Sequence, residues 1–349
     1  MKEEIETKKE TEIKQNRNTN IIEIKKNINT NTIEIKQTKR FSVIEVIENT
    51  ISPQIPRVNH IVLFFSKGSE RGNNDSENKI RESILEKITT ENCFDEYFSD
   101  AEYGSKWNYL KNKWNECLIS LYPMRFSSIK IIQKAGRIFN YDFLVIYYDE
   151  NKNVLCEKKI EFKHNVSSIS KLPQFLSLTD KTANFISSKY AEFYYDHYLD
   201  KYIELDQELQ LIEKPEKQQY INFIGNINYD IHPLFRKMYD NENIEKKNKN
   251  AIVNNSIKAF LETYVNTIDF TILTELFQSR QKDKIFVLWD LTKFHIETIE
   301  QDVVEKFVLI ENNNKIVVEG QKYKYCLLLR WRNHKGILNP AWQISLKTK

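Results

Sequence analysis

Residues 140–148 read Asn-Tyr-Asp-Phe-Leu-Val-Ile-Tyr-Tyr and decide the fold class of this chain. A run so rich in β-branched and aromatic residues is typical of a central strand that is buried on both faces. Asp142 is the exception, because burying a carboxylate is costly unless a partner offsets its charge. The run therefore predicts a buried strand with a paired or functional acid near its start.

A second strand follows after a short polar turn at 149–153. Residues 154–162 favour a strand, and Glu161 and Lys163 share one of its faces because side chains alternate along a strand. In a hairpin, the end of the second strand returns beside the start of the first. The sequence therefore predicts that Glu161 and Lys163 lie beside Asp142 at one end of the sheet.

Two carboxylates and one ammonium group suit the hydrolysis of a phosphodiester. Carboxylates bind Mg²⁺, and the metal neutralises the phosphate and lowers the pKa of an attacking water. Lys163 would orient or deprotonate that water. The same residues also fit an ordinary hairpin, in which Asp142 pairs with Lys163 and Glu161 is solvated. The Glu-x-Lys pattern alone does not exclude this alternative, because it recurs elsewhere in this chain.

The core of this region resembles a known nuclease superfamily. Residues 133–143, followed by Glu161-Phe162-Lys163, resemble the core of the PD-(D/E)xK superfamily, which has the restriction-endonuclease-like fold. Four further segments resemble uncharacterised members found in large DNA viruses: 172–175, 193–199, 329–333 and 340–343. The resemblance covers mainly residues 60–205. It implies an α/β fold, with a restriction-endonuclease-like core whose central mixed β-sheet is flanked by helices, plus an α+β extension at the C-terminus.

The resemblance also assigns roles to the hairpin residues. Asp142 and Glu161 would be metal ligands, and Lys163 the catalytic lysine, of an endonuclease that cuts DNA with Mg²⁺ or Mn²⁺. Tyr141 stands where the motif has its leading proline, a departure that leaves the chemistry untouched. Sites of this kind often act in pairs, so a homodimer is compatible with the resemblance, although no sequence feature establishes it.

Members of the superfamily often take a third acid from the first core helix. Glu77 and Glu82 are the candidates for this third metal ligand, and Glu116 on a later helix is a weaker one. Gln174 follows the catalytic strand and is expected to contact either the metal-bound water or the backbone. The Gln-x-x-x-Tyr pattern of the recombination exonucleases is missing, because Leu178 occupies its last place, which favours an endonuclease.

Several basic residues are candidates for phosphate binding, because arginine and lysine neutralise phosphates. They are Lys134, Arg137, Arg330, Arg332 and Lys335. Trp331 would stack on an exposed base, although the alternation around it also fits an edge strand, and the first two basic residues also fit a solvated turn. His164 is either structural or a substrate contact. His197 and the tyrosines of residues 190–202 are predicted to lie in the core.

Composition limits the cellular setting. The net charge of +3 is too small for a global nucleic-acid-binding field, so any basic surface must be local. The four cysteines form no Cys-x-x-Cys pair, which argues against a structural zinc site and for a reducing compartment. No signal peptide or membrane span is visible. We therefore expect a soluble intracellular protein, in the host cytoplasm or nucleus or in the virion if the chain is viral.

Four regions are expected along the chain. Residues 1–40 contain a unit such as Ile-Glu-Ile-Lys that recurs about every 11 residues, and we interpret them as a disordered low-complexity tail rather than a coiled coil. Residues 41–242 would form the nuclease core, 243–255 a loop, and 256–349 an α+β region that is either a separate subdomain or packed on the core. Two rivals stay open: an inert nucleic-acid-binding or structural protein on the same fold, and an unrelated interaction module.

Overall fold

The structure is a computed structural model of the whole chain, and the parts that it describes lie in ten segments. These are residues 13–17, 20–27, 32–37, 56–67, 75–89, 94–134, 139–225, 229–240, 246–332 and 339–349. The chain divides into two compact units, Met1–Arg57 and Val58–Lys349.

The first unit contains an antiparallel sheet of β1 (Ile13–Arg17), β2 (Asn20–Asn27) and β3 (Thr32–Gln37). The 11-residue repeat sets its register, since Ile13 lies opposite Ile24 and Ile24 lies opposite Ile35. The repeat unit alternates apolar with charged residues, which fits the two-residue period of a strand. The disordered tail expected from composition stays a prediction, and its residues 1–12, 18–19, 28–31 and 38–40 lie outside the described residues.

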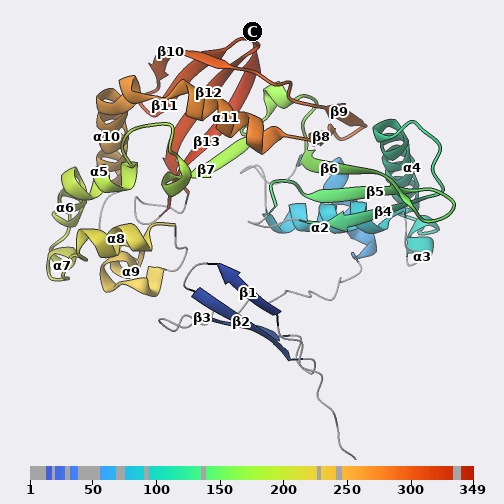
Figure 1. The fold of residues 1–349 in the computed structure, drawn as a ribbon, viewed down its shortest axis with the longest axis horizontal. Helices are drawn as coiled ribbons and strands as arrows, with labels where there is room; N and C mark the ends of the chain where they lie inside the picture. The colour runs from blue at the N-terminus through green and yellow to red at the C-terminus, as the bar shows by residue number, and fades with distance from the viewer. Residues whose placement is uncertain are drawn as a thin grey trace, which may run out of the picture. The chain divides into compact units, whose positions relative to one another are not determined.

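The second unit is an α/β structure with two five-stranded sheets (Figure 1). Its strands are β4 (Ser128–Gln133), β5 (Phe143–Tyr148), β6 (Val154–His164), β7 (Leu176–Thr179), β8 (Lys284–Trp289), β9 (Phe294–Glu297), β10 (Val304–Glu311), β11 (Lys315–Gly320), β12 (Tyr323–Trp331) and β13 (Pro340–Thr348). Its α-helices are α1 (Val62–Phe65), α2 (Asp75–Lys87), α3 (Asp95–Phe98), α4 (Gly104–Leu121), α5 (Tyr190–His197), α6 (Leu199–Ile203), α7 (Gln207–Gln210), α8 (Lys217–Phe223), α9 (Pro233–Asp240), α10 (Lys246–Tyr264) and α11 (Phe270–Gln281).

The first sheet is mixed and has the order β4-β5-β6-β8-β9. Its neighbouring strands are antiparallel except for β6 and β8, which run parallel. The β5–β6 hairpin turns at 149–153, where Asp149 accepts hydrogen bonds from the backbone of Asn151 and Asn153, and Lys152 has a φ of 64°. The strands, hairpin and mixed sheet predicted for this region are present.

The two faces of strand β8 in the mixed sheet belong to different hydrophobic cores. Val287 and Trp289 of β8 pack with α2, α4 and the alternate residues of β5, and Figure 1 shows α2 and α4 beside this sheet. Phe286 and Leu288 point to the other core, which contains the second sheet and helices α5 to α11. This alternation follows from the strand period and explains why β8 is apolar from Ile285 to Trp289.

The second sheet is antiparallel and has the order β10-β11-β12-β13-β7. The two sheets exchange chain segments, because β7 comes from the region expected to be nuclease core and β8 and β9 come from the region expected to be a C-terminal extension. The division at 242 and 256 therefore does not separate the two sheets. The loop expected at 243–255 also differs, since α10 begins at Lys246. In the described part of the chain, no helix has the length and apolar character that a membrane crossing needs.

Candidate active site

Asp142 stands directly before β5 and is held by the backbone on both sides. Its N–H donates to the carbonyl of Ile160 at 2.8 Å, and its carbonyl accepts from the N–H of Lys134 at 2.7 Å. Its side chain turns toward β6, where Oδ2 accepts from the N–H of Phe162 at 2.8 Å. The hairpin register thus fixes this carboxylate against the C-terminal end of the neighbouring strand.

The side chains of Glu161 and Lys163 come from the same face of β6 and meet Asp142 there. Lys163 Nζ lies 2.5 Å from Glu161 Oε1 and 4.0 Å from Asp142 Oδ2. The ordinary hairpin considered above has a solvated Glu161 and a direct Asp142–Lys163 pair. The structure has instead a half-buried Glu161 as the nearer partner of the lysine.

Lys284, the first residue of β8, is a fourth member of this site that sequence reasoning missed. It is buried, with Nζ 3.5 Å from Glu161 Oε2 and 3.1 Å from the carbonyl of Asn140. Because β6 and β8 are parallel, Lys284 lies opposite Lys159 and on the same face as Glu161. A lysine opening an apolar run was a signal, but the sequence does not say which strand pairs with it.

Helix α2 brings a third carboxylate to the site. Glu82 is buried, and its Oε2 accepts from Gln133 Nε2 at 2.7 Å. One turn later, Glu86 Oε1 accepts from the N–H of Gln133 at 2.9 Å. Two acids one helical turn apart therefore anchor α2 to the end of β4, and Glu82 is close enough to Asp142 for their charges to interact.

The two carboxylates that are short of cationic partners have raised pKa values. Burial, together with the negative charge of Asp142, raises the pKa of Glu82 to about 7. Burial, with the charge of Glu161 adding to it, raises the pKa of Asp142 to about 6, although Lys163 opposes the change. Both groups therefore take up protons more readily than ordinary carboxylates.

Glu161 behaves in the opposite way. Burial alone would raise its pKa, but the charges of Lys163 and Lys284 outweigh burial and lower it. Burial is likewise outweighed for Lys163, whose pKa is raised by Glu161 and Asp142, whereas burial lowers the pKa of Lys284. Glu161 and Lys163 are thus an ionised pair at neutral pH.

The charges at the site do not balance. Three carboxylates, those of Glu82, Asp142 and Glu161, face two ammonium groups, and both ammonium groups lie nearest to Glu161. A divalent hard cation prefers carboxylate oxygens and retains several waters, so this donor set fits Mg²⁺ or Mn²⁺ beside Asp142. Among the described residues, however, no three or more His, Cys, Asp or Glu side chains form a ready-made metal site.

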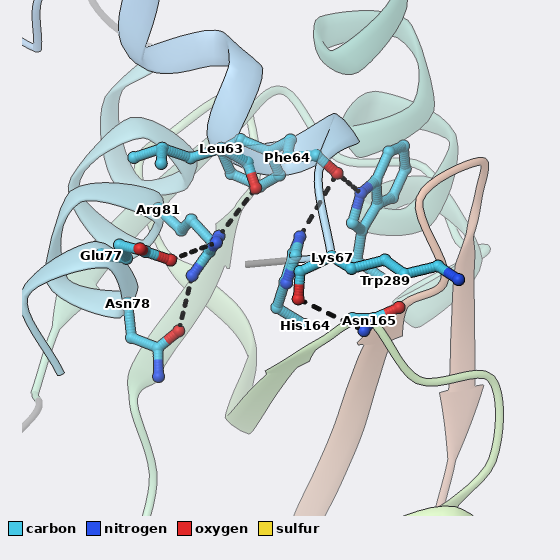
Figure 2. Close-up of polar contacts among 9 residues, drawn as sticks. All are labelled: Leu63, Phe64, Lys67, Glu77, Asn78, Arg81, His164, Asn165 and Trp289. Carbon is cyan, nitrogen blue, oxygen red and sulfur yellow. Dashed lines mark hydrogen bonds and ion pairs between the residues drawn. The ribbon is translucent and has the colours of Figure 1, made fainter. Parts of the chain in front are cut away.

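Glu77 and Glu116 do not share the position of Glu82. Figure 2 shows Glu77 turned toward Arg81, with its Oε2 3.0 Å from Arg81 Nη2, while the same guanidinium also contacts Asn78 and the carbonyl of Leu63. Glu116 is exposed and pairs with Lys113 at 2.7 Å. Of the three predicted third acids, the structure brings only Glu82 beside Asp142.

Two predictions about histidines have different outcomes. His164 Nε2 lies 3.3 Å from the carbonyl of Phe64 (Figure 2), and burial near the charge of Arg81 lowers its pKa to about 4. This neutral ring has a structural contact between β6 and α1. His197 was expected in the core, but it is exposed at the end of α5, whereas Tyr190, Tyr194 and Tyr202 are buried as predicted.

The remaining candidates have no side-chain contact with this cluster among the described residues, or lie outside those residues. Gln174 is exposed just before β7, and within the described segments no hydrogen bond joins it to Asp142, Glu161 or Lys163. Lys134 is half-buried at the end of β4 and lies over the ring of Phe139.

The C-terminal basic residues belong to the second sheet. Arg330 and Arg332 are exposed, and Arg332 contacts the hydroxyl of Ser177. Trp331 between them was considered as a base-stacking platform, but it is buried and donates to the hydroxyl of Tyr190 at 3.1 Å. Alternation in the strand turns Trp331 inward and its neighbours outward. Arg137 and Lys335 lie outside the described residues.

Comparisons with known proteins give no relative for this chain: no family model, curated protein or solved structure matches it.

Proposed function

We propose that the second unit is a metal-dependent nuclease with Asp142, Glu161 and Lys163 at its active site, and that it hydrolyses phosphodiester bonds of DNA as an endonuclease. The observation that carries the proposal is the convergence of these three side chains, with Lys163 Nζ 2.5 Å and 4.0 Å from the two carboxylates. The neighbouring Glu82 adds the helix-borne acid that such a site commonly has.

The architecture supports a restriction-endonuclease-like core as part of this proposal. The acidic residues come from an antiparallel pair, β5 and β6, inside a mixed sheet, and the third acid comes from α2 packed on that sheet. Mixed sheets with helices are common in many enzyme folds, so the sheet alone does not distinguish this class. The site chemistry is what favours a nuclease.

The residues have distinct roles in the proposal. Asp142, with Glu82 and Glu161, would hold Mg²⁺ or Mn²⁺, which supplies charge neutralisation at the phosphate and acidifies a bound water. Lys163 would orient the attacking water and stabilise the charge that develops on the phosphate. Lys284 is a positioning residue, because it contacts Glu161 Oε2 while Lys163 contacts Oε1.

A second candidate function has an observation in its favour. As placed, Lys163 is tied to Glu161, and no ready-made set of three metal-ligating side chains exists among the described residues. An inert DNA-binding or structural protein on the same fold would tolerate both features. The two candidates differ in a single respect, which is whether a bound strand is cut.

The test is cleavage of supercoiled plasmid and linear DNA with Mg²⁺, Mn²⁺ or EDTA, by the wild type and by Asp142→Asn. The matched control is Asp196→Asn, which also removes a carboxylate paired with a lysine, here Lys217 at 2.6 Å. We expect metal-dependent cleavage that falls roughly 100-fold or more in Asp142→Asn and is unchanged in the control.

The cleavage products also test whether DNA is the partner and whether the protein acts as a homodimer. Open circles indicate cutting of one strand by single sites, while direct linearisation supports a homodimer that cuts both strands. DNA binding without cleavage under every metal condition would replace the nuclease by the inert binding protein. Equal cleavage by Asp142→Asn and the wild type would move the activity away from this site.

A further inference from the structure

A cavity of about 180 Å³ lies beside the junction of α11 and β8. Its buried wall contains Phe175, Phe277 and Tyr325, and its exposed rim contains Lys282, Asp283 and Glu300. An apolar cavity of about 150 Å³ is large enough to bind benzene, so this cavity has room for a flat ring ligand.

The aromatic wall is preformed. The ring of Phe277 lies 4.6 Å from that of Tyr325 and 5.9 Å from that of Phe175, measured between centroids. Aromatic rings at such distances attract one another in stacked or edge-to-face arrangements. A planar ligand that enters the cavity thus meets aromatic side chains that are already ordered. Little side-chain conformational entropy is therefore lost on binding.

Gln281, the last residue of α11, also lines the cavity and has an unusual side chain. It is 9% exposed, and neither its amide nitrogen nor its amide oxygen has a hydrogen-bond partner among the described residues. Leaving buried polar atoms unpaired is unfavourable. Because the amide has no partner to lose among the described residues, pairing with a ligand in the cavity would break no hydrogen bond.

An amide that presents a donor and an acceptor side by side matches the edge of a nucleobase, as in glutamine pairing with adenine. The lining disfavours a phosphate, since its carboxylates, those of Asp283, Glu300 and the buried Asp302, outnumber its one ammonium group, that of Lys282. Asp283 and Glu300 also pair with Lys159 and Lys322, which lie outside the lining. These carboxylates can accept from an exocyclic amine, which adenine has and thymine lacks.

The cavity and the candidate active site share a backbone segment. Lys282 and Asp283 immediately precede Lys284, the lysine that contacts Glu161. Asn140, two residues before Asp142, donates through Nδ2 to the carbonyl of Arg280 at 2.8 Å. A base held in the cavity therefore lies at the α11–β8 connection that borders the carboxylates.

From these observations we propose that the cavity binds a nucleobase with an exocyclic amine, of the adenine type, with Gln281 reading its edge and the aromatic wall packing against its ring. The same chemistry serves a base of a bound DNA strand or a free nucleoside. Binding of a base in a DNA strand rests on the proposed function, whereas binding of a free nucleoside does not.

The first experiment measures binding of adenosine to the full chain in EDTA by calorimetry, which separates it from any cleavage. We expect saturable binding, a loss of roughly 10- to 100-fold in Gln281→Leu, and a similar loss for purine riboside, which lacks the amine. Gln218→Leu, an exposed glutamine on α8, is the matched control and should bind as the wild type does. The melting temperature of Gln281→Leu should equal or exceed that of the wild type, because an unpaired buried amide is removed.

The second experiment compares labelled oligo(dA) and oligo(dT), with Asp142→Asn as the background to prevent cutting. A preference for oligo(dA) that adenosine competes away and Gln281→Leu abolishes assigns the cavity to a strand. Adenosine binding without that preference assigns it to a free nucleoside. The proposal is overturned if adenosine fails to bind, or if folded Gln281→Leu binds it as tightly as the wild type. Absence of nuclease activity would leave the adenosine result unaffected.

Discussion

At the scale of single residues, the sequence predicted those site residues that lie close together along the chain. Asp142, Glu161 and Lys163 lie on two strands joined by a short turn, so strand alternation alone brings them together. Lys284 comes from a distant strand, and no local pattern pairs it with β6. Glu77 and Glu82 were equivalent candidates in the sequence. They are five positions apart, or about 140° around a helix, so only the packing of α2 distinguishes them.

Lys284→Met tests the role of the missed lysine. Its removal leaves Glu161 Oε2 without its ammonium partner in a buried setting. We expect the free energy of unfolding to fall by about 1–3 kcal/mol and DNA cleavage to fall with it, measured by urea denaturation and plasmid nicking. Lys217→Met removes an exposed partner of Asp196 and is the control. A Lys284→Met protein as stable and as active as the wild type would show that the contact is dispensable.

At the scale of elements, the apolar run at 140–148 and the alternation at 154–162 predicted β5 and β6. They did not predict β7, β10 or β13. Strand β10 lies at a sheet edge, exposes Val308 and Leu309, and carries register shifts against β11, so its sequence lacks a clean buried face. Strand β7 has only four residues, too few for a period to be recognised.

The docking of α2 gives a prediction of pH dependence. The folded pKa of Glu82 is raised to about 7, so its contribution to stability is complete below its ordinary pKa and is lost as pH rises through 7. In EDTA, we expect the wild type to lose stability between pH 6 and pH 8. Glu82→Gln should lose less, and at pH 8 it should be more stable by about 1–3 kcal/mol.

The measurement is thermal unfolding at pH 6 and pH 8, with Glu116→Gln as the exposed control. Added Mg²⁺ should stabilise the wild type more at pH 8 than at pH 6, because metal binding requires the ionised carboxylates. If the stability of Glu82→Gln and that of the wild type had the same pH dependence, this would contradict a raised pKa for the buried Glu82 carboxyl.

At the scale of the whole molecule, the expected linear order of regions differs from the arrangement of the sheets. Composition suggested a boundary near residues 243–255, but β8 and β9 from beyond it complete the mixed sheet, and β7 from before it completes the second sheet. Sequence patterns give elements and not their pairing, so a boundary drawn from composition does not detect an exchange of strands between sheets.

This exchange predicts that residues 41–242 do not fold alone. Such a fragment lacks Lys284 and Trp289, whose indole donates to the carbonyl of Phe64 at 2.6 Å inside the core. We expect no cooperative thermal transition and no cleavage. A chain of residues 58–349 keeps the entire second unit and should unfold cooperatively. Cooperative unfolding of the 41–242 fragment would show that the mixed sheet does not need β8.

The central proposal is that Lys163 is a catalytic residue of the site that contains Asp142 and Glu161. Measuring DNA binding and DNA cleavage in the same samples tests it most directly. Fluorescence anisotropy gives the DNA affinity, and single-turnover cleavage with Mg²⁺ gives the rate, for wild type, Lys163→Met and the control Lys217→Met. We predict a rate roughly 100-fold lower in Lys163→Met, affinity within a few-fold of the wild type, and a control like the wild type. Equal cleavage rates in Lys163→Met and the wild type would contradict a nuclease site at these residues.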